Sequence, residues 1–119
     1  MKILVVHRQK EITHRISEAL HYEDPVIRYF DSGLEGLLAT RIESFDLIVC
    51  SANLPVITGM ELVKSIRANS INKHVPTVFI VEEPTGNLLE ENVFVFTAEE
   101  FISKIPNWLV ENKVLVNSV

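Results

Sequence analysis

Short apolar runs alternate with amphipathic stretches along most of this chain, and this alternation constrains its fold more than any other feature. The runs are Lys2–Val6, Val26–Phe30, Leu47–Cys50 and Thr77–Val81. Short, near-continuous apolar runs are typical of strands that are buried on both faces. The segments between them carry apolar residues at helical spacing. The pattern therefore predicts right-handed crossovers and a parallel sheet with helices on both faces.

One of these runs presents a polar side chain where its strand is predicted to end. Asp46–Cys50 is followed by Ser51, then by Pro55 in a turn, and then by a helix start at Thr58. An α/β protein places its binding residues just outside the carboxyl ends of its strands. Ser51 is therefore the side chain around which a site at this edge would be built.

Two helix starts are marked by capping boxes, in which a hydroxyl residue is followed three positions later by glutamate. The boxes are Ser32 with Glu35, and Thr58 with Glu61. The three predicted helices have apolar stripes that comprise Ile12, Ile16, Ala19 and Leu20; Leu34, Leu37, Leu38 and Ile42; and Leu62, Val63 and Ile66. We expect these stripes to face the sheet and to form the core on both sides of it.

The last third of the chain admits two interpretations. The first has a helix, then a short fifth strand at Phe101–Ser103, and a final helix over Trp108–Val116. The inward-facing side chains of its first helix are Leu88, Leu89, Asn92, Val93 and Phe96. This interpretation keeps Pro106 outside any helix.

The second interpretation makes Val93–Phe96 the fifth strand, because β-branched and aromatic residues favour strands. Thr97 then caps a helix, and Glu100 completes the capping box. The stripe of this helix is Phe101, Ile102, Ile105, Trp108 and Leu109. Pro106 counts against it, since an interior proline costs a helix about 3 kcal/mol. Local signals leave the two interpretations even.

At 119 residues, the chain is predicted to form a single domain over residues 1–119. Its composition, 47% hydrophobic and 23% charged, is that of an ordinary soluble protein. No apolar run approaches the roughly 18 residues of a membrane span, and the short run Ile3–Val6 is no secretory signal. The one cysteine, Cys50, is expected to be a buried thiol. These features predict a cytoplasmic protein that does not enter a membrane.

The net charge of −5 is carried by one segment. Basic and acidic residues balance at nine each over residues 1–81, whereas residues 82–100 contain six glutamates and no Lys or Arg. These are Glu82, Glu83, Glu90, Glu91, Glu99 and Glu100. The segment is either a solvated face or a contact surface for a basic partner. Nucleic acid is not an expected partner, because phosphate neutralisation needs a basic patch and none is visible.

The chain resembles the receiver domains of two-component response regulators over nearly its whole length. Lys2–Val6 is similar to that family's first strand, which ordinarily ends in an acidic pair, and Asp46–Cys50 to its third, which ends in the phosphoacceptor aspartate. Leu54–Leu62 resembles the loop and helix start that follow. Pro76–Val81 resembles the fourth strand, which ends in a switch hydroxyl, and Ala98–Lys104 the run that ends in the family's lysine. The fold implied is a doubly wound, flavodoxin-like sheet of five parallel strands in the order 2-1-3-4-5.

The positions that the resemblance marks as active depart from the family pattern. His7 and Arg8 stand at the acidic pair, Ser51 at the phosphoacceptor and Val81 at the switch hydroxyl. Only Lys104 matches the pattern. The spacing from Val81 to Lys104 also suits the family, which favours the first interpretation of the last third.

Receiver chemistry, as the resemblance implies it, needs a carboxylate nucleophile and a divalent metal. None of the positions His7, Arg8 and Ser51 supplies a carboxylate, and Arg8 adds a fixed positive charge. Two unit charges 4 Å apart repel by about 4 kcal/mol at an effective dielectric near 20. We therefore expect no metal site, no cofactor and no aspartyl phosphate. Hydrolysis by a Ser51–His7 pair is not expected either, because there is no G-x-S-x-G motif and no acidic residue to orient the imidazole.

His7, Arg8 and Lys104 together define another possibility. If the three meet at the sheet edge, the sign of the pocket is inverted, and it suits an anion or an acidic side chain. Glu82 directly follows the fourth strand, however, and is an available internal partner for Arg8. An Arg8–Glu82 salt bridge is therefore the favoured expectation.

The leading prediction is a pseudo-receiver: a non-enzymatic, phosphorylation-independent module that acts through protein contacts. The alternatives are a receiver phosphorylated at an atypical residue and an anion- or nucleotide-responsive switch that uses His7, Arg8 and Lys104. The resemblance implies an interaction face on the last helices and the fifth strand, which here holds the six glutamates with Phe94 and Phe96. The expected partner is a basic protein, a signalling kinase, an output protein or a second copy of the chain.

Overall fold

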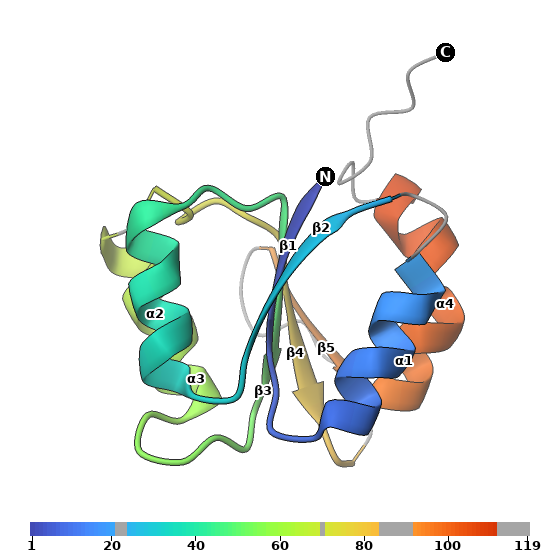
Figure 1. Cartoon of the computed structure of the whole chain (residues 1–119), viewed down its shortest axis with the longest axis horizontal. Helices are drawn as coiled ribbons and strands as arrows, with labels where there is room; N and C mark the ends of the chain where they lie inside the picture. Colours follow the sequence, from blue (N-terminus) through green and yellow to red (C-terminus); the bar gives the residue numbers. More distant parts are fainter. Residues whose placement is uncertain (21–23, 70, 84–91, 112–119) are drawn as a thin grey trace.

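A five-stranded parallel sheet forms the centre of the computed structural model, which describes residues 1–20, 24–69, 71–83 and 92–111 (Figure 1). The strands are β1 (Lys2–Val6), β2 (Val26–Phe30), β3 (Leu47–Ser51), β4 (Thr77–Val81) and β5 (Val93–Thr97). Their order is β2-β1-β3-β4-β5, and each neighbouring pair is parallel. The predicted fold class and strand order are confirmed.

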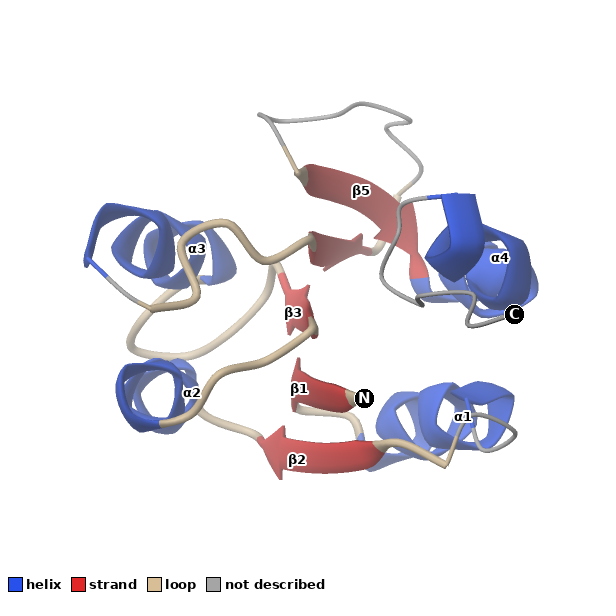
Figure 2. Cartoon of the chain, turned by 90° about the horizontal axis from the view of Figure 1, so that it is seen from above, coloured by secondary structure: helices blue, strands red, loops and turns tan. Residues whose placement is uncertain are grey.

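Helices cover both faces of this sheet, as Figure 2 shows from above. α1 (Lys10–Leu20) and α4 (Ala98–Glu111) lie on one face, and α2 (Gly33–Ile42) and α3 (Gly59–Asn69) lie on the other. In the part of the chain that the structure describes, no helix has the length and apolarity of a membrane span.

Alternate residues of the central strands belong to the two cores, one on each face of the sheet, because successive side chains of a strand point to opposite faces. In β1, Leu4 and Val6 belong to the core under α2 and α3, whereas Ile3 and Val5 belong to the core under α1 and α4. Cys50 is fully buried, as predicted, and burial raises the pKa of its thiol to about 12. The predicted stripes of α1 and α3 face these cores; Ile16, Leu20, Leu62, Val63 and Ile66 are buried.

Helix α2 turns its small residues toward the sheet, so the prediction for its stripe is wrong. Its buried residues are Gly33, Gly36, Ala39 and Thr40. Of the predicted stripe, only Leu37 packs against the core, whereas Leu34, Leu38 and Ile42 are 49%, 55% and 78% exposed. A Cβ on Gly36 would lie only 2.7 Å from Cγ2 of Val6, so the helix approaches β1 more closely than a larger residue allows. The helix therefore rotates its large apolar side chains outward.

The end of the chain follows the second interpretation, and the favoured first interpretation is wrong. Residues 93–97 pair with β4 along their whole length. The capping box forms as the second interpretation predicts: the Thr97 amide donates to Glu100 Oε1 at 2.8 Å, and the Glu100 amide donates to Thr97 Oγ1 at 3.2 Å. Helix α4 then continues through Pro106, and burial of Phe101 and Ile105 in the core offsets the hydrogen bond that proline cannot donate. Leu88 and Leu89 lie outside the described residues.

Two polar side chains hold the connections between α2, α3 and the sheet. Asn72, which is fully buried, donates from Nδ2 to the carbonyls of Thr40 and Glu43 and accepts at Oδ1 from the Phe45 amide, each at 2.8 Å. The guanidinium of Arg67 donates to the carbonyls of residues 73, 75 and 92 at 2.7–2.9 Å. Neither residue was singled out from the sequence, because an isolated Asn or Arg in a polar stretch gives no local signal.

Candidate functional site

An open cleft of about 950 Å³ lies at the carboxyl edge of the sheet. It is lined by residues 7–9 after β1, 51–53 at the end of β3, 80–83 at the end of β4, and 97–99 at the junction of β5 and α4, together with Ile12 of α1. The parallel strands bring these segments together although they are far apart in the sequence. His7, Arg8, Ser51 and Val81, which the sequence had singled out, all line this cleft.

Ser51 lies at the end of β3, and it is only 6% exposed. Its Oγ accepts a hydrogen bond from the backbone amide of Asn53 at 3.1 Å. The backbone of Ser51 also packs closely against Gly59, because a Cβ on Gly59 would lie 2.1 Å from the Ser51 carbonyl oxygen. The start of α3 therefore fits against Ser51 only through a glycine, and the Ser51 hydroxyl stabilises the loop that follows its own strand.

His7 follows β1 and is fixed by two backbone hydrogen bonds. Its amide donates to the Phe30 carbonyl, and its Nδ1 accepts from the Gln9 amide, both at 3.0 Å. Burial lowers the pKa of the imidazole from its usual value, so the neutral form is favoured. Because Nδ1 is the acceptor, the proton of the neutral ring sits on Nε2. That nitrogen is then a donor, and it is unsuited to take a proton from Ser51.

The predicted Arg8–Glu82 salt bridge is not present among the described residues. Both side chains are exposed and reach the cleft from different strands. The ion pair that forms beside the cleft instead joins Arg15 of α1 to Glu99 of α4, with Nη–Oε distances of 2.5 and 2.8 Å. The hydrogen bond from Arg15 also lowers the pKa of the Glu99 carboxyl. A long side chain at an exposed position after a strand can adopt many rotamers. The position of such a residue in the sequence therefore does not determine which partner it reaches.

Lys104 is not among the residues that line the cleft. The resemblance of Ala98–Lys104 to the run that ends in the family's lysine had placed it at the sheet edge. It lies in α4, where its Nζ is 5.4 Å from the centroid of the Phe96 ring. His7, Arg8 and Lys104 therefore do not meet at the cleft. The residue that ends β5 at the cleft is Thr97, which the sequence had marked only as a helix cap.

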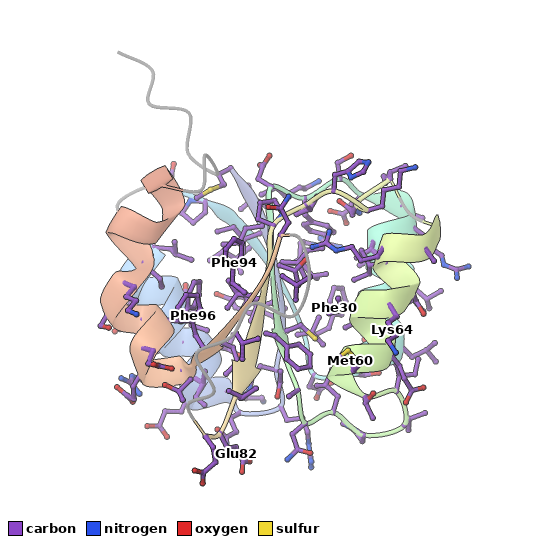
Figure 3. The ribbon with its side chains drawn as sticks, turned by 180° about the vertical axis from the view of Figure 1, so that it is seen from behind. Phe30, Met60, Lys64, Glu82, Phe94 and Phe96 are labelled. Atoms are coloured by element: carbon purple, nitrogen blue, oxygen red, sulfur yellow. The ribbon has the colours of Figure 1, made fainter. Side chains whose placement is uncertain are left out.

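The aromatic residues of the predicted interaction face are turned toward the helices (Figure 3). Phe94 and Phe96 are partly buried and pack against the core under α1 and α4. The Phe96 ring also stacks on Phe101, with centroids 5.9 Å apart. The glutamates of the predicted interaction face have different environments. Glu82 and Glu83 are exposed at the cleft, whereas Glu100 belongs to the capping box. Glu90 and Glu91 lie outside the described residues.

The ends of β1 and β3 do not fit a magnesium ion, although Glu82, Glu83 and Glu99 line other parts of the cleft. Mg²⁺ binds through oxygen ligands, chiefly carboxylates. The ends of β1 and β3 supply an imidazole, a guanidinium and a serine hydroxyl that already accepts a hydrogen bond. Within the described ranges, no three or more His, Cys, Asp or Glu side chains gather into a possible metal site. Arg8 also adds a fixed positive charge to the cleft, which disfavours a divalent cation there.

The sequence matches the family model of the response regulator receiver domain over residues 3–110. The chain belongs to this family. Its fold matches that of the chemotaxis response regulator CheY4 of Vibrio cholerae, with a TM-score of 0.74 and 25% identity over 96% of this chain and 98% of that one. It also matches the receiver domain of the sensor histidine kinase PA1611 from Pseudomonas aeruginosa PAO1, with a TM-score of 0.69 and 20% identity over 92% and 97% of the two chains. That structure has a magnesium ion coordinated in its active site cleft.

Two relatives by sequence support the same assignment. Chemotaxis protein CheY-3 of Vibrio cholerae is 31% identical over 86 residues, which are 70% of this chain and 65% of the relative. Hybrid signal transduction histidine kinase D of Dictyostelium discoideum is 29% identical over 120 residues, which are 93% of this chain. The match spans only 8% of that kinase, so this chain corresponds to one part of a much longer protein there.

Proposed function

We propose that this chain is a pseudo-receiver, a binding module of two-component signalling that works without phosphorylation and without catalysing a reaction. The observation that carries this proposal is the chemistry at the end of β3. The side chain there is a hydroxyl, it is 6% exposed, and its oxygen is already hydrogen-bonded to the Asn53 amide. A hydroxyl in this state lacks the negative charge of the carboxylate that receivers use as a nucleophile.

The neighbours of Ser51 support the same conclusion. Activation of a serine requires a positioned base, and the ring nitrogen of His7 that is free of backbone bonds carries a proton in the neutral form. Phosphoryl transfer also requires a cation that neutralises the phosphates, and His7, Arg8 and Ser51 at the ends of β1 and β3 offer Mg²⁺ no carboxylate. The ends of β1 and β3 therefore lack a charged nucleophile, a base for Ser51 and carboxylate ligands for a metal.

The carboxyl edge of the sheet nevertheless has an open cleft with charged side chains around it. Glu82, Glu83 and Arg8 are exposed around the cleft, on strand ends that the packed sheet holds in place. Surface groups on a rigid edge suit recognition of a partner protein, since binding then costs little ordering of the backbone. The partner contact would involve basic groups for the two glutamates and a carboxylate for Arg8.

The proposal is tested on the unmodified chain with Mg²⁺ and acetyl phosphate. We expect the intact mass to stay unchanged, while a receiver known to be phosphorylated gains a phosphoryl group in the same tube. Isothermal titration with Mg²⁺ should give no saturable heat. A labile adduct on this chain, localised by fragmentation to any residue, would show that it remains a phosphoacceptor and would overturn the proposal.

A further inference from the structure

Helix α2 carries an exposed apolar row on the side opposite its buried face. The row is formed by Leu34, Leu38 and Ile42, which are 49%, 55% and 78% exposed. These residues are four apart, so they lie along one inclined ridge of the helix. The small residues that face the sheet place Leu38 on the outermost side of α2. In Figure 2, α2 lies at a corner of the molecule, and none of the other labelled elements lies beyond its outer face.

Two exposed residues of opposite charge flank this row. At 100° per residue, Glu35 lies about 60° to one side of Leu38 and Arg41 about 60° to the other side. They are also separated along the axis, since six residues rise by about 9 Å. Glu35 and Arg41 take part in none of the ion pairs recorded among the described residues. The row therefore has an acidic side near its start and a basic side near its end.

We propose that this surface binds a second copy of the same chain, with the two α2 helices crossing at Leu38. A twofold axis that runs along the row places Leu38 against Leu38 and carries Glu35 of each copy over Arg41 of the other. A twofold axis perpendicular to the row would instead bring the two Glu35 side chains together and the two Arg41 side chains together. The charges thus favour the first arrangement, in which the surface of one copy is complementary to the same surface of the other.

The selected arrangement is also a favourable way to pack two helices. With the axis along the ridge, the i, i+4 ridges of both helices are parallel to each other, which corresponds to the common crossing near −50°. The interface is isologous, as in most symmetric dimers. One helix per copy gives a contact at the small end of specific interfaces, so we expect a dissociation constant of about 100 µM.

The test is sedimentation velocity of the intact chain from low micromolar to millimolar concentration. The unmodified chain should shift from monomer to dimer over this range. Leu38→Glu should weaken the association at least tenfold, because it places two carboxylates at the centre of the contact. Glu35→Arg and Arg41→Glu should each weaken it several-fold, because each turns two attractive pairs into repulsive ones. The double variant Glu35→Arg/Arg41→Glu should restore most of the lost affinity.

Two controls separate this contact from unspecific association or loss of fold. Tyr29→Glu also places a charge on an exposed apolar residue, but its strand partner Val5 belongs to the core on the other face of the sheet, so the dimer should be unaffected. Circular dichroism at low concentration checks that each variant keeps its helices. A chain that remains monomeric to about 1 mM, or a double variant no better than its single parents, would overturn the proposal.

Discussion

The hydroxyl oxygen of Ser51 accepts a hydrogen bond from the backbone amide of Asn53 at 3.1 Å. The side chain at the end of β3 thus closes the first turn of the loop that leads to α3. A phosphoacceptor would have to leave its oxygens free for a metal and a phosphoryl donor. Ser51 has a structural task at this position, and that task suits a module that keeps its edge rigid.

The first prediction concerns restoration of the acceptor. Ser51→Asp supplies a carboxylate, but Arg8 still repels a divalent ion and His7 offers it no carboxylate, so we expect no phosphoryl adduct with Mg²⁺ and acetyl phosphate. Intact mass spectrometry measures the adduct, and titration calorimetry measures Mg²⁺ binding. The triple variant His7→Asp/Arg8→Asp/Ser51→Asp should gain saturable Mg²⁺ binding. If Ser51→Asp alone takes up phosphate, the role assigned to Arg8 is wrong.

The second prediction concerns pH. Burial lowers the pKa of His7 below its ordinary value of 6.5, so the unfolded chain binds the proton more readily than the folded one. The free energy of unfolding should therefore fall as the pH falls from about 6.5 through the lowered folded pKa, and His7 should contribute no pH dependence above this range. Urea unfolding between about pH 7.5 and 5 measures this fall, and His7→Gln should remove part of it.

The pH window separates His7 from the carboxylates. The hydrogen bond from Lys2 lowers the pKa of Glu43, and the one from Arg15 lowers the pKa of Glu99, so the stabilisation from these pairs is present above about pH 4.5 and is lost only as the pH falls further. An NMR titration of the His7 ring gives the folded pKa directly. A midpoint at or above 6.5 would contradict the burial argument.

The third prediction concerns the close approach of α2 to β1. Gly36→Ala adds a Cβ that would lie 2.7 Å from Cγ2 of Val6, a stiff and fully buried side chain. We expect a net loss of about 1–3 kcal/mol in the free energy of unfolding, despite the better helix propensity of alanine. Val6→Ala alone should also destabilise the protein, because it leaves a cavity. The double variant should lose less than the sum, since the added methyl fills space that Val6 vacates.

The fourth prediction concerns Asn72. Asn72→Ala removes three hydrogen bonds and leaves buried carbonyl and amide groups around the end of α2 without this partner. We expect a loss of about 2–4 kcal/mol, measured by chemical unfolding. Asn72→Asp should be worse at neutral pH, because a carboxylate oxygen would replace the Nδ2 that donates to the carbonyls of Thr40 and Glu43. Equal stability of the two variants would show that the amide donors contribute little.

Most of the sheet was predictable because buried parallel strands leave a plain signal: the runs from Lys2, Leu47 and Thr77 are apolar almost without interruption. The edge position of Ser51 followed from the same signal. The orientation of helix α2 was not predictable from its large apolar residues, because close packing on β1 selects Gly36 and Ala39. A stripe of small residues gives almost no signal in a hydrophobicity pattern.

The end of the chain was misassigned for a different reason. The spacing to Lys104 was given more weight than the local signals of Val93–Phe96 and of the Thr97–Glu100 box, and the local signals were right. The side-chain contacts of the cleft were the least predictable part. The backbone bond to His7 Nδ1 and the pairing of Glu99 with Arg15 depend on tertiary positions that no sequence spacing reveals.

No loop residue separates β5 from α4, since Thr97 ends the strand and Ala98 begins the helix. Thr97 lines the cleft, while the 14-residue helix that follows it is held down by Phe101 and Ile105. A short flexible connection would absorb a small displacement at the cleft, but this junction has no slack. We therefore expect a partner that displaces Thr97 to displace the start of α4 with it.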